Sequence, residues 1–197
     1  LGDVYKRQAL QDAYISITES LRHAAVANEA ELDIHWVNAE EIEADDTDMA
    51  KVMAGVDGIL VPGGFGNRGI EGKIKAIQYA REHKIPFFGI CLGMQCAVIE
   101  FARHVCGMAD ANSSEFNPNS THPVIDLMPE QIDVEDLGGT MRLGRQEVPV
   151  APNTLAHKIY GDVVAERHRH RYEVNNSYVP QFEEKGMVIS AKTPLEH

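Results

Sequence analysis

The sequence predicts a three-layer α/β fold, in which a mainly parallel sheet has helices on both faces. Short apolar runs typical of buried parallel strands alternate with a segment of helical periodicity at 58–61, 70–83 and 87–90. Strands that alternate with helices in this way favour a parallel sheet. The length of 197 residues suits one domain with a substantial core.

The remaining elements are expected on either side of these runs. Residues 1–9 continue no periodic pattern and are interpreted as an unmatched or non-native leader, which leaves residues 10–197 as the domain. Before the first run we expect a helix over 12–30, a strand over 32–36 and a short helix over 47–54. After the last run we expect a helix over 92–105, a loop-rich stretch over 110–135, an antiparallel pair over 140–150, a short helix over 154–160, an extended segment over 162–174 and a strand over 187–191.

Composition and charge disfavour several classes of function. The 18 bases and 30 acids give a net charge of −12, which disfavours binding to nucleic acids or anionic membranes. No apolar run is long enough for a membrane helix, and no signal-peptide pattern opens the chain. Three cysteines without a C-x-x-C pair disfavour a disulfide scaffold or a zinc site and fit a reducing cytoplasm. The acidic cluster between Glu40 and Asp48 is interpreted as a solvated loop.

A cysteine between two glycines is the strongest local signal of chemistry. Cys91 lies within residues 89–93 (GICLG), where a buried strand is expected to run into a helix, and this is the nucleophile-elbow pattern with cysteine in place of serine. The glycines permit a sharp turn, and the partial positive charge of a helix N-terminus favours the reactive thiolate. Cys91 is therefore the candidate nucleophile, whereas Cys96 and Cys106 lack this setting and are expected in the core.

A glycine-rich loop follows the first buried strand. Gly64, Gly66 and Gly69 match G-x-G-x-x-G, the pattern of a dinucleotide-binding loop. That interpretation is disfavoured because the loop does not follow an opening strand and the next strand does not end in an acid for a ribose. We expect instead that the loop faces the elbow from the neighbouring strand, where a glycine N–H joins the Leu92 N–H in holding a tetrahedral oxyanion.

A charged segment at 166–173 alternates arginines with histidines. In an extended chain the arginines share one face, which suits a carboxylate or a phosphate, and the histidines share the other. These residues are Arg167, Arg169 and Arg171 on one face and His168 and His170 on the other. A solvated charged strand is the alternative. No metal site is expected, because no matching Cys/His set accompanies the two histidines.

Five motifs together carry a family resemblance. They are VPGGFG at 61–66, GICLGMQ at 89–95, ANSSEF at 111–116, LGGTMRLG at 137–144 and ERHRHRYEVNN at 166–176. The second alone indicates a class I glutamine amidotransferase, and with the last two the chain resembles the glutaminase domain of the CTP synthase family. The resemblance spans about residues 10–193. It implies the flavodoxin-like amidotransferase fold, with the active site at the carboxyl edge of the strands.

The resemblance implies a role for each candidate residue. Cys91 attacks the side-chain amide of L-glutamine to form a glutamyl thioester, and the N–H groups of Gly64 and Leu92 form the oxyanion hole. Glu115 suits the α-ammonium group of the substrate, and Arg171 suits its α-carboxylate. The implied substrate-binding set is Gly64, Leu92, Gly93, Met94, Gln95, Glu115 and Arg171. The segment linked to activation by GTP corresponds to Arg68, Gly69 and Glu71.

The resemblance also implies partners and two departures. Released ammonia passes to a synthetase domain of the same protein, which uses ATP and Mg²⁺ to aminate UTP to CTP, so that the glutaminase domain needs no cofactor. A cytoplasmic homo-oligomer is expected. The leader replaces the family's first strand, and the His-Pro-Glu segment that carries the catalytic His and Glu does not occur in the 197 residues. The chain as given is therefore expected to be nearly inactive alone.

Two other interpretations stay open at this point. A DJ-1/PfpI-like hydrolase shares the G-x-C-x-G elbow, but it has no reason to carry Glu115 or the arginine-rich segment. A non-catalytic glutamine-binding domain accounts for the missing His and Glu.

Overall fold

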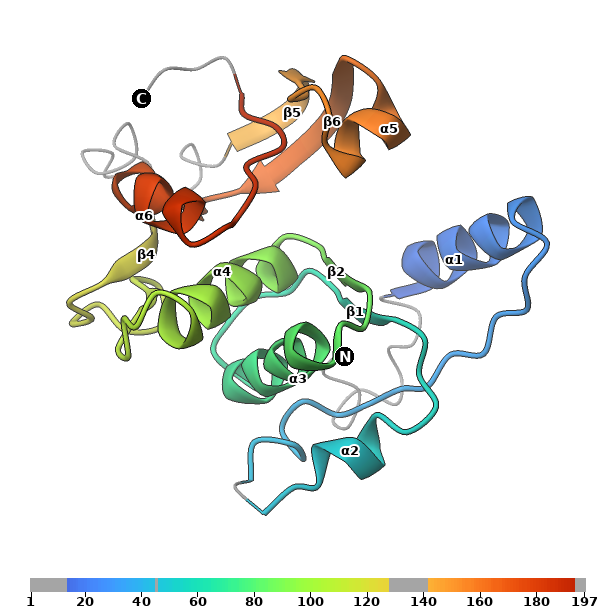
Figure 1. Ribbon diagram of the computed structural model, residues 1–197, viewed down its shortest axis with the longest axis horizontal. Coiled ribbons are helices and arrows are strands. Elements are labelled where there is room, and N and C mark those ends of the chain that lie inside the picture. The colour runs from blue at the N-terminus through green and yellow to red at the C-terminus, as the bar shows by residue number, and fades with distance from the viewer. Residues whose placement is uncertain (1–13, 45, 128–141, 194–197) are drawn as a thin grey trace. The chain divides into compact units, whose positions relative to one another are not determined.

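The computed structural model describes residues 14–44, 46–127 and 142–193 (Figure 1). The chain divides into two compact units, Leu1–Glu100 and Phe101–His197, and each is described by itself. The leader over 1–9 and the part of the fourth motif before residue 142 lie outside the described residues.

A parallel strand pair, with a helix after each strand, forms the centre of the first unit. The strand β1 (Ile59–Val61) pairs in parallel with β2 (Phe87–Gly89). The helix α3 (Ile70–His83) follows β1, and α4 (Leu92–His104) begins after β2 and ends in the second unit. These four elements confirm the prediction with nearly the expected bounds, because apolar runs and glycine or proline breaks mark each of them in the sequence.

The two helices bury apolar side chains at helical spacing, and glycine permits their close approach to the strands. The buried positions are Ile70, Ile74, Ile77 and Ala80 on α3 and Leu92, Cys96 and Ile99 on α4. A β-carbon at Gly93 would lie 2.1 Å from the carbonyl oxygen of Val61, and one at Gly89 would lie 2.6 Å from the carbonyl carbon of Gly93. Only glycine therefore fits at positions 89 and 93, on either side of the turn from β2 into α4.

An ion pair joins α3 to α4. The Nε atom of Arg81 donates to the two carboxylate oxygens of Glu100 at 3.0 and 3.1 Å, and Nη2 donates to Oε1 at 2.8 Å. Glu100 is only 1% exposed, so its charge is compensated inside the protein. The hydrogen bond to Glu100 raises the pKa of Arg81.

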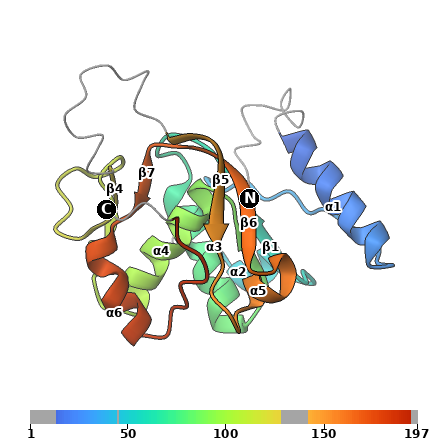
Figure 2. The ribbon, with the colours of Figure 1, turned by 90° about the horizontal axis from the view of Figure 1, so that it is seen from above.

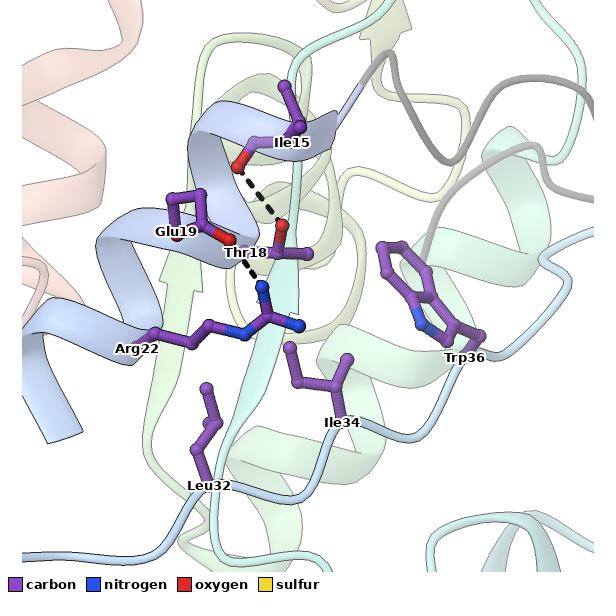
Figure 3. Close-up of a pocket in the computed structure, with 7 residues that line it drawn as sticks. All are labelled: Ile15, Thr18, Glu19, Arg22, Leu32, Ile34 and Trp36. Carbon is purple, nitrogen blue, oxygen red and sulfur yellow. Dashed lines mark hydrogen bonds and ion pairs between the residues drawn. The ribbon is translucent and has the colours of Figure 1, made fainter.

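The helix α1 (Ile15–Ala27) confirms the prediction of a helix over 12–30, but the predicted strand over 32–36 is wrong. This segment has irregular backbone, and its apolar side chains line a cavity of about 350 Å³ beside α1 (Figure 3). The lining residues are Ile15, Thr18, Glu19, Arg22, Leu32, Ile34 and Trp36. Leu32 and Trp36 are each 39% exposed, and no described strand pairs with the segment, so its alternation alone was not enough to predict a strand.

The short helix expected over 47–54 is α2 (Met49–Val52). Its N-terminus is capped by Asp48, whose carboxylate accepts a hydrogen bond from the N–H of Lys51 at 3.2 Å.

Two small sheets form the second unit. The strand β4 (Pro123–Leu127) pairs in parallel with β3 (Asn112–Ser113) and antiparallel with β7 (Tyr172–Val174). The strands β5 (Arg142–Pro149) and β6 (Val163–His170) form an antiparallel pair (Figure 2). The expected pair over 140–150 is thus one strand whose partner comes from the predicted extended segment. The strands of the described residues fall into three small sheets and not one continuous sheet.

Helical segments complete the second unit. The predicted helix over 154–160 is α5 (Leu155–Tyr160), where Thr154 Oγ1 accepts from the N–H of His157 at 3.1 Å. The 3₁₀ turn Asn176–Tyr178 and α6 (Val179–Glu184), in which Phe182 is fully buried, were not predicted from the sequence. The predicted strand over 187–191 is reduced to an isolated bridge between Val150 and Ala191.

Candidate active site

Cys91 occupies the sharp turn between β2 and α4. Its φ of +52° is a left-handed conformation that a non-glycine residue adopts at a cost of about 1–3 kcal/mol. The N–H of Gly93 donates to the carbonyl of Ile90 at 2.9 Å, and the N–H of Gln95 donates to the carbonyl of Cys91 at 3.1 Å. Cys91 therefore directly precedes the first turn of α4, and it is exposed at the helix N-terminus, an environment that favours anions.

The glycine-rich loop between β1 and α3 packs against this turn. A β-carbon at Gly63 would lie 3.4 Å from the β-carbon of Cys91, and one at Gly64 would lie 3.3 Å from Cδ2 of Leu92. The loop thus runs beside the elbow as expected, and Gly64 lies next to Leu92. Two main-chain segments around one thiol are the arrangement that an oxyanion hole requires. Sequence reasoning missed the contact of Gly63.

The other predicted residues of α4 and the other cysteines lie in different surroundings. Gly93 and Gln95 are buried, whereas Met94 is 40% exposed. Cys96 is fully buried, and Cys106 is half-buried. Burial raises the pKa of the Cys106 thiol, and Lys185 partly opposes this shift. Of the three thiols, that of Cys91 is therefore the accessible one.

The residues predicted for activation by GTP lie at the far end of the same loop. Gly69 has a φ of +66° and precedes α3, and Glu71 is exposed in the first turn of that helix. The guanidinium of Arg68 forms an ion pair with the carboxylate of Glu40. Arg68 Nε donates to Glu40 Oε1 at 2.7 Å, and Arg68 Nη2 donates to Glu40 Oε2 at 2.5 Å. Glu40 thus lies exposed in a turn, as the interpretation of a solvated acidic loop expects, but it also forms an ion pair that this interpretation does not include. No local pattern indicates this contact between residues 28 positions apart in the chain.

Glu115, in the second unit, is positioned by a tight turn after β3. The N–H of Glu115 donates to Ser113 Oγ at 3.2 Å, and the N–H of Asn117 donates to the Ser113 carbonyl at 2.9 Å. Ser113 is completely buried, so the residue that accepts these two hydrogen bonds is held by the surrounding protein. The carboxyl of Glu115 is exposed, but the surrounding protein raises its pKa through partial desolvation, and the charge of Arg171 opposes that shift.

Arg171 occupies the break between β6 and β7. It is half-buried, and its Nε atom is enclosed without a hydrogen-bond partner among the described residues. Its charge acts on Glu115 and opposes the rise of that residue's pKa, but no hydrogen bond or ion pair joins these two described side chains. The neighbouring Tyr172 has a raised pKa, first because of burial and then because of Glu115. A carboxylate and a guanidinium complement the two charges of an α-amino acid.

The arginine–histidine segment alternates as predicted, but Arg171 differs from its neighbours. In β6, Arg167 is exposed, whereas His168 and His170 are half-buried with Nδ1 and Nε2 2.9 Å apart. Arg171 lies beyond the end of β6 and is more buried than Arg167, so the solvated-strand alternative does not describe it. The side chain of Arg169 lies outside what the structure describes.

Two cavities among the described residues of the first unit are lined without Cys91. The larger, of about 590 Å³, is lined by mainly apolar residues such as Leu21, Trp36 and Phe88, and the smaller lies beside α1 (Figure 3).

Among the helices that the structure describes, none has the length and apolar character that crossing a membrane requires. Within the same residues, no cluster of three His, Cys, Asp or Glu side chains is placed to hold a metal ion.

The elbow and its glycine loop have the geometry of a cysteine nucleophile beside main-chain N–H groups, and comparison with protein families identifies the class. The model of the glutamine amidotransferase class-I family matches residues 9–197. The chain therefore belongs to the class-I glutamine amidotransferase family. This result confirms the predicted fold class and favours the amidotransferase over the DJ-1/PfpI-like hydrolase.

Similar proteins narrow the class further. Over 97% of its length the chain is 59% identical to the CTP synthase of Geobacillus kaustophilus, and over 94% it is 60% identical to that of Thermus thermophilus. It covers 36% and 34% of those proteins, so it spans about a third of their length. A structure of the Trypanosoma brucei CTPS glutaminase domain with bound acivicin matches 95% of this chain and 72% of that one, at a TM-score of 0.88 and 46% identity. The fold is thus that of the glutaminase domain of CTP synthases.

Proposed function

We propose that the chain is the glutamine-hydrolysing part of a CTP synthase, with Cys91 as its nucleophile. The observation that carries this proposal is the exposed cysteine with left-handed φ at the start of α4, beside the backbone of Gly63 and Gly64. A thiolate at this point attacks the side-chain carbonyl carbon of glutamine. The tetrahedral oxyanion is held by the N–H groups of Gly64 and Leu92, and the amide nitrogen leaves as ammonia once it is protonated. Water then cleaves the glutamyl thioester and releases glutamate.

In this proposal, different residues recognise the α-amino acid group of glutamine and its side-chain amide. Glu115 binds the α-ammonium group and Arg171 the α-carboxylate, which agrees with their coupling and with the enclosed, partnerless Nε of Arg171 among the described residues. The side-chain amide lies at Cys91. The segment of α4 from Gly93 to Gln95 completes the proposed binding set. A similar protein of known structure, a CTPS glutaminase domain, has acivicin bound, which supports a small-molecule site in this domain.

The longer relatives suggest what becomes of the ammonia. We propose that it passes to a synthetase domain of the same protein and aminates UTP that ATP and Mg²⁺ have activated. The thioester chemistry needs neither of these cofactors, so the glutaminase domain works without a metal. Activation by GTP through Arg68, Gly69 and Glu71, a homo-oligomer and a cytoplasmic location belong to the same proposal.

The test measures protection of Cys91 from alkylation, because the sequence contains no His-Pro-Glu segment and turnover is a poor readout. The chain is treated with iodoacetamide, and the modified peptides are quantified by mass spectrometry. L-Glutamine is expected to slow alkylation of Cys91 with a saturable dependence, whereas D-glutamine and L-asparagine leave the rate unchanged. Cys106 serves as the internal control. Equal rates with and without L-glutamine would overturn the proposal.

A further inference from the structure

Two side chains anchor the far end of the glycine-rich loop. The carboxylate of Glu40 accepts from Nε and Nη2 of Arg68 at 2.7 and 2.5 Å. The Nζ atom of Lys73, a residue only 6% exposed, donates to the carbonyl oxygen of Arg68 at 2.8 Å. Both the side chain and the main chain of Arg68 are therefore fixed. Bidentate binding of this kind sets the orientation of a guanidinium as well as its position.

The anchor itself belongs to a rigid part of the first unit. The residue before Glu40 is Ala39, which is 2% exposed and packs on the start of α3. A β-carbon at Gly72 would lie 1.9 Å from the Ala39 carbonyl oxygen, and one at Gly69 would lie 2.8 Å from the Ala39 β-carbon. The N–H of Glu40 donates to Asn38 Oδ1 at 3.1 Å, which fixes the turn. Glu40 thus reaches Arg68 from backbone that is locked onto α3.

The loop between β1 and Arg68 needs such an anchor. Four glycines occur in residues 63–69, and Phe65 in the middle is 81% exposed, so its side chain contributes little to holding the loop. Glycine has more backbone freedom than any other residue, and a glycine-rich loop held at one end only would sample many conformations. The near end of this same loop, Gly63 and Gly64, lies against Cys91 and Leu92.

We propose that Glu40 is a positioning residue for the oxyanion hole: by clamping Arg68 to α3, it holds the main chain of Gly64 beside Cys91. Glu40 lies on a segment between α1 and α2 and touches neither substrate nor thiol in this role (Figure 1). The inference rests on the proposed function, because it takes the Gly64 N–H as an oxyanion donor. It assigns a role in the site to Glu40, a residue that the sequence analysis interprets only as part of a solvated acidic loop.

A positioning role is separable from a purely structural one. The side chains of Arg68 and Glu40 are 41% and 38% exposed, and an ion pair so exposed contributes little to global stability. Loss of Glu40 is therefore expected to leave the thermal unfolding midpoint nearly unchanged. It is expected to slow a reaction that develops an oxyanion. Binding of the α-ammonium and α-carboxylate groups by Glu115 and Arg171 is unaffected.

The experiment uses 6-diazo-5-oxo-L-norleucine, a glutamine analogue whose keto group takes the place of the amide carbonyl. Its maximal labelling rate at Cys91 and its half-saturating concentration are measured for the wild-type chain, for Glu40→Ala and for the control Asp46→Ala, which removes an exposed acid of the same cluster. In Glu40→Ala the maximal rate is expected to fall about tenfold, a fraction of the roughly 10²–10³-fold cost of losing an oxyanion donor outright. The half-saturating concentration stays within about twofold, as does the iodoacetamide rate, which needs no oxyanion hole.

A charge exchange provides the rescue. The double variant Glu40→Arg with Arg68→Glu restores an ion pair between the same positions and is expected to recover most of the labelling rate, whereas Glu40→Arg alone does not. An unchanged maximal rate in Glu40→Ala, or equal losses in Glu40→Ala and Asp46→Ala, would overturn the inference while the proposed function stands. If the wild-type chain itself is not labelled at Cys91, the proposed function fails, and the inference fails with it.

Discussion

Replacement of Gly93 by alanine tests how closely α4 must approach β1. The new β-carbon would lie 2.1 Å from the carbonyl oxygen and 2.8 Å from the carbonyl carbon of Val61, where ordinary contacts begin at 3.4 Å. The start of α4 must therefore withdraw by about 1.3 Å, since neither atom belongs to a flexible side chain. Alanine favours a helix over glycine by about 1 kcal/mol. Overpacking costs about 1–3 kcal/mol or more, and backbone on both sides of the clash puts this site at the upper end.

We therefore expect Gly93→Ala to lower the free energy of unfolding by about 2 kcal/mol. The same displacement moves Cys91, and a shift of about 1 Å in a reacting group costs about 10²-fold in rate. Urea denaturation measures the stability, and labelling of Cys91 by the diazo ketone measures the rate.

The matched control is Gly58→Ala. There a β-carbon meets only the carbonyl oxygen of Pro86 at 3.7 Å, so the change is expected to stay within about 0.5 kcal/mol. The reasoning is refuted if Gly93→Ala unfolds at the wild-type urea concentration and its Cys91 is labelled at the wild-type rate.

Three further results are expected. The substitution Arg81→Ala leaves the buried carboxylate of Glu100 without its main partner, so it is expected to lower the free energy of unfolding by about 3 kcal/mol. The control Glu82→Ala is expected to change this free energy by less than about 0.5 kcal/mol. Equal effects of the two variants in urea denaturation would contradict the contribution of the buried ion pair. Because burial raises the pKa of Cys106, its alkylation is expected to need a more alkaline pH than alkylation of an unperturbed thiol. The extent of modification of the Cys106 peptide is measured as a function of pH. A Cys106 that reacts at the same pH as free cysteine would contradict the raised pKa. Arg171→Gln removes the charge that lowers the pKa of Glu115, so this pKa is expected to rise further and the carboxylate form is lost at a higher pH. NMR titration of the Glu115 carboxyl in the ligand-free chain measures the shift, and an unchanged midpoint would contradict the coupling.

The elements that the sequence predicted best are those that local patterns determine. The runs at β1 and β2 are apolar throughout, and glycine or proline marks the ends of α3, which makes the order of strand and helix readable without tertiary information. The elbow could be predicted for the same reason. Two glycines around a cysteine at a strand end leave few other conformations, and the φ of Cys91 agrees with that expectation.

The features that escaped prediction depend on contacts between distant residues. The segment over 32–36 has the alternation of a strand, but no described strand pairs with it and its side chains line a cavity beside α1, and a local pattern does not show whether a pairing partner exists. Glu40 is one of several neighbouring acids, and only the fold shows that it reaches Arg68. Likewise, the sequence suggested Glu115 and Arg171 through a resemblance, whereas their proximity follows from the pairing of β4 with both β3 and β7.

The most direct test of the central claim is the site of covalent modification by 6-diazo-5-oxo-L-norleucine. Peptide mass spectrometry of the treated chain is predicted to find one adduct, on Cys91, which forms more slowly when L-glutamine is present and is absent from the Cys91→Ser variant. An adduct chiefly on Cys96 or Cys106, or one on Cys91 that glutamine does not slow, would contradict the assignment of Cys91 as the nucleophile of a glutamine site.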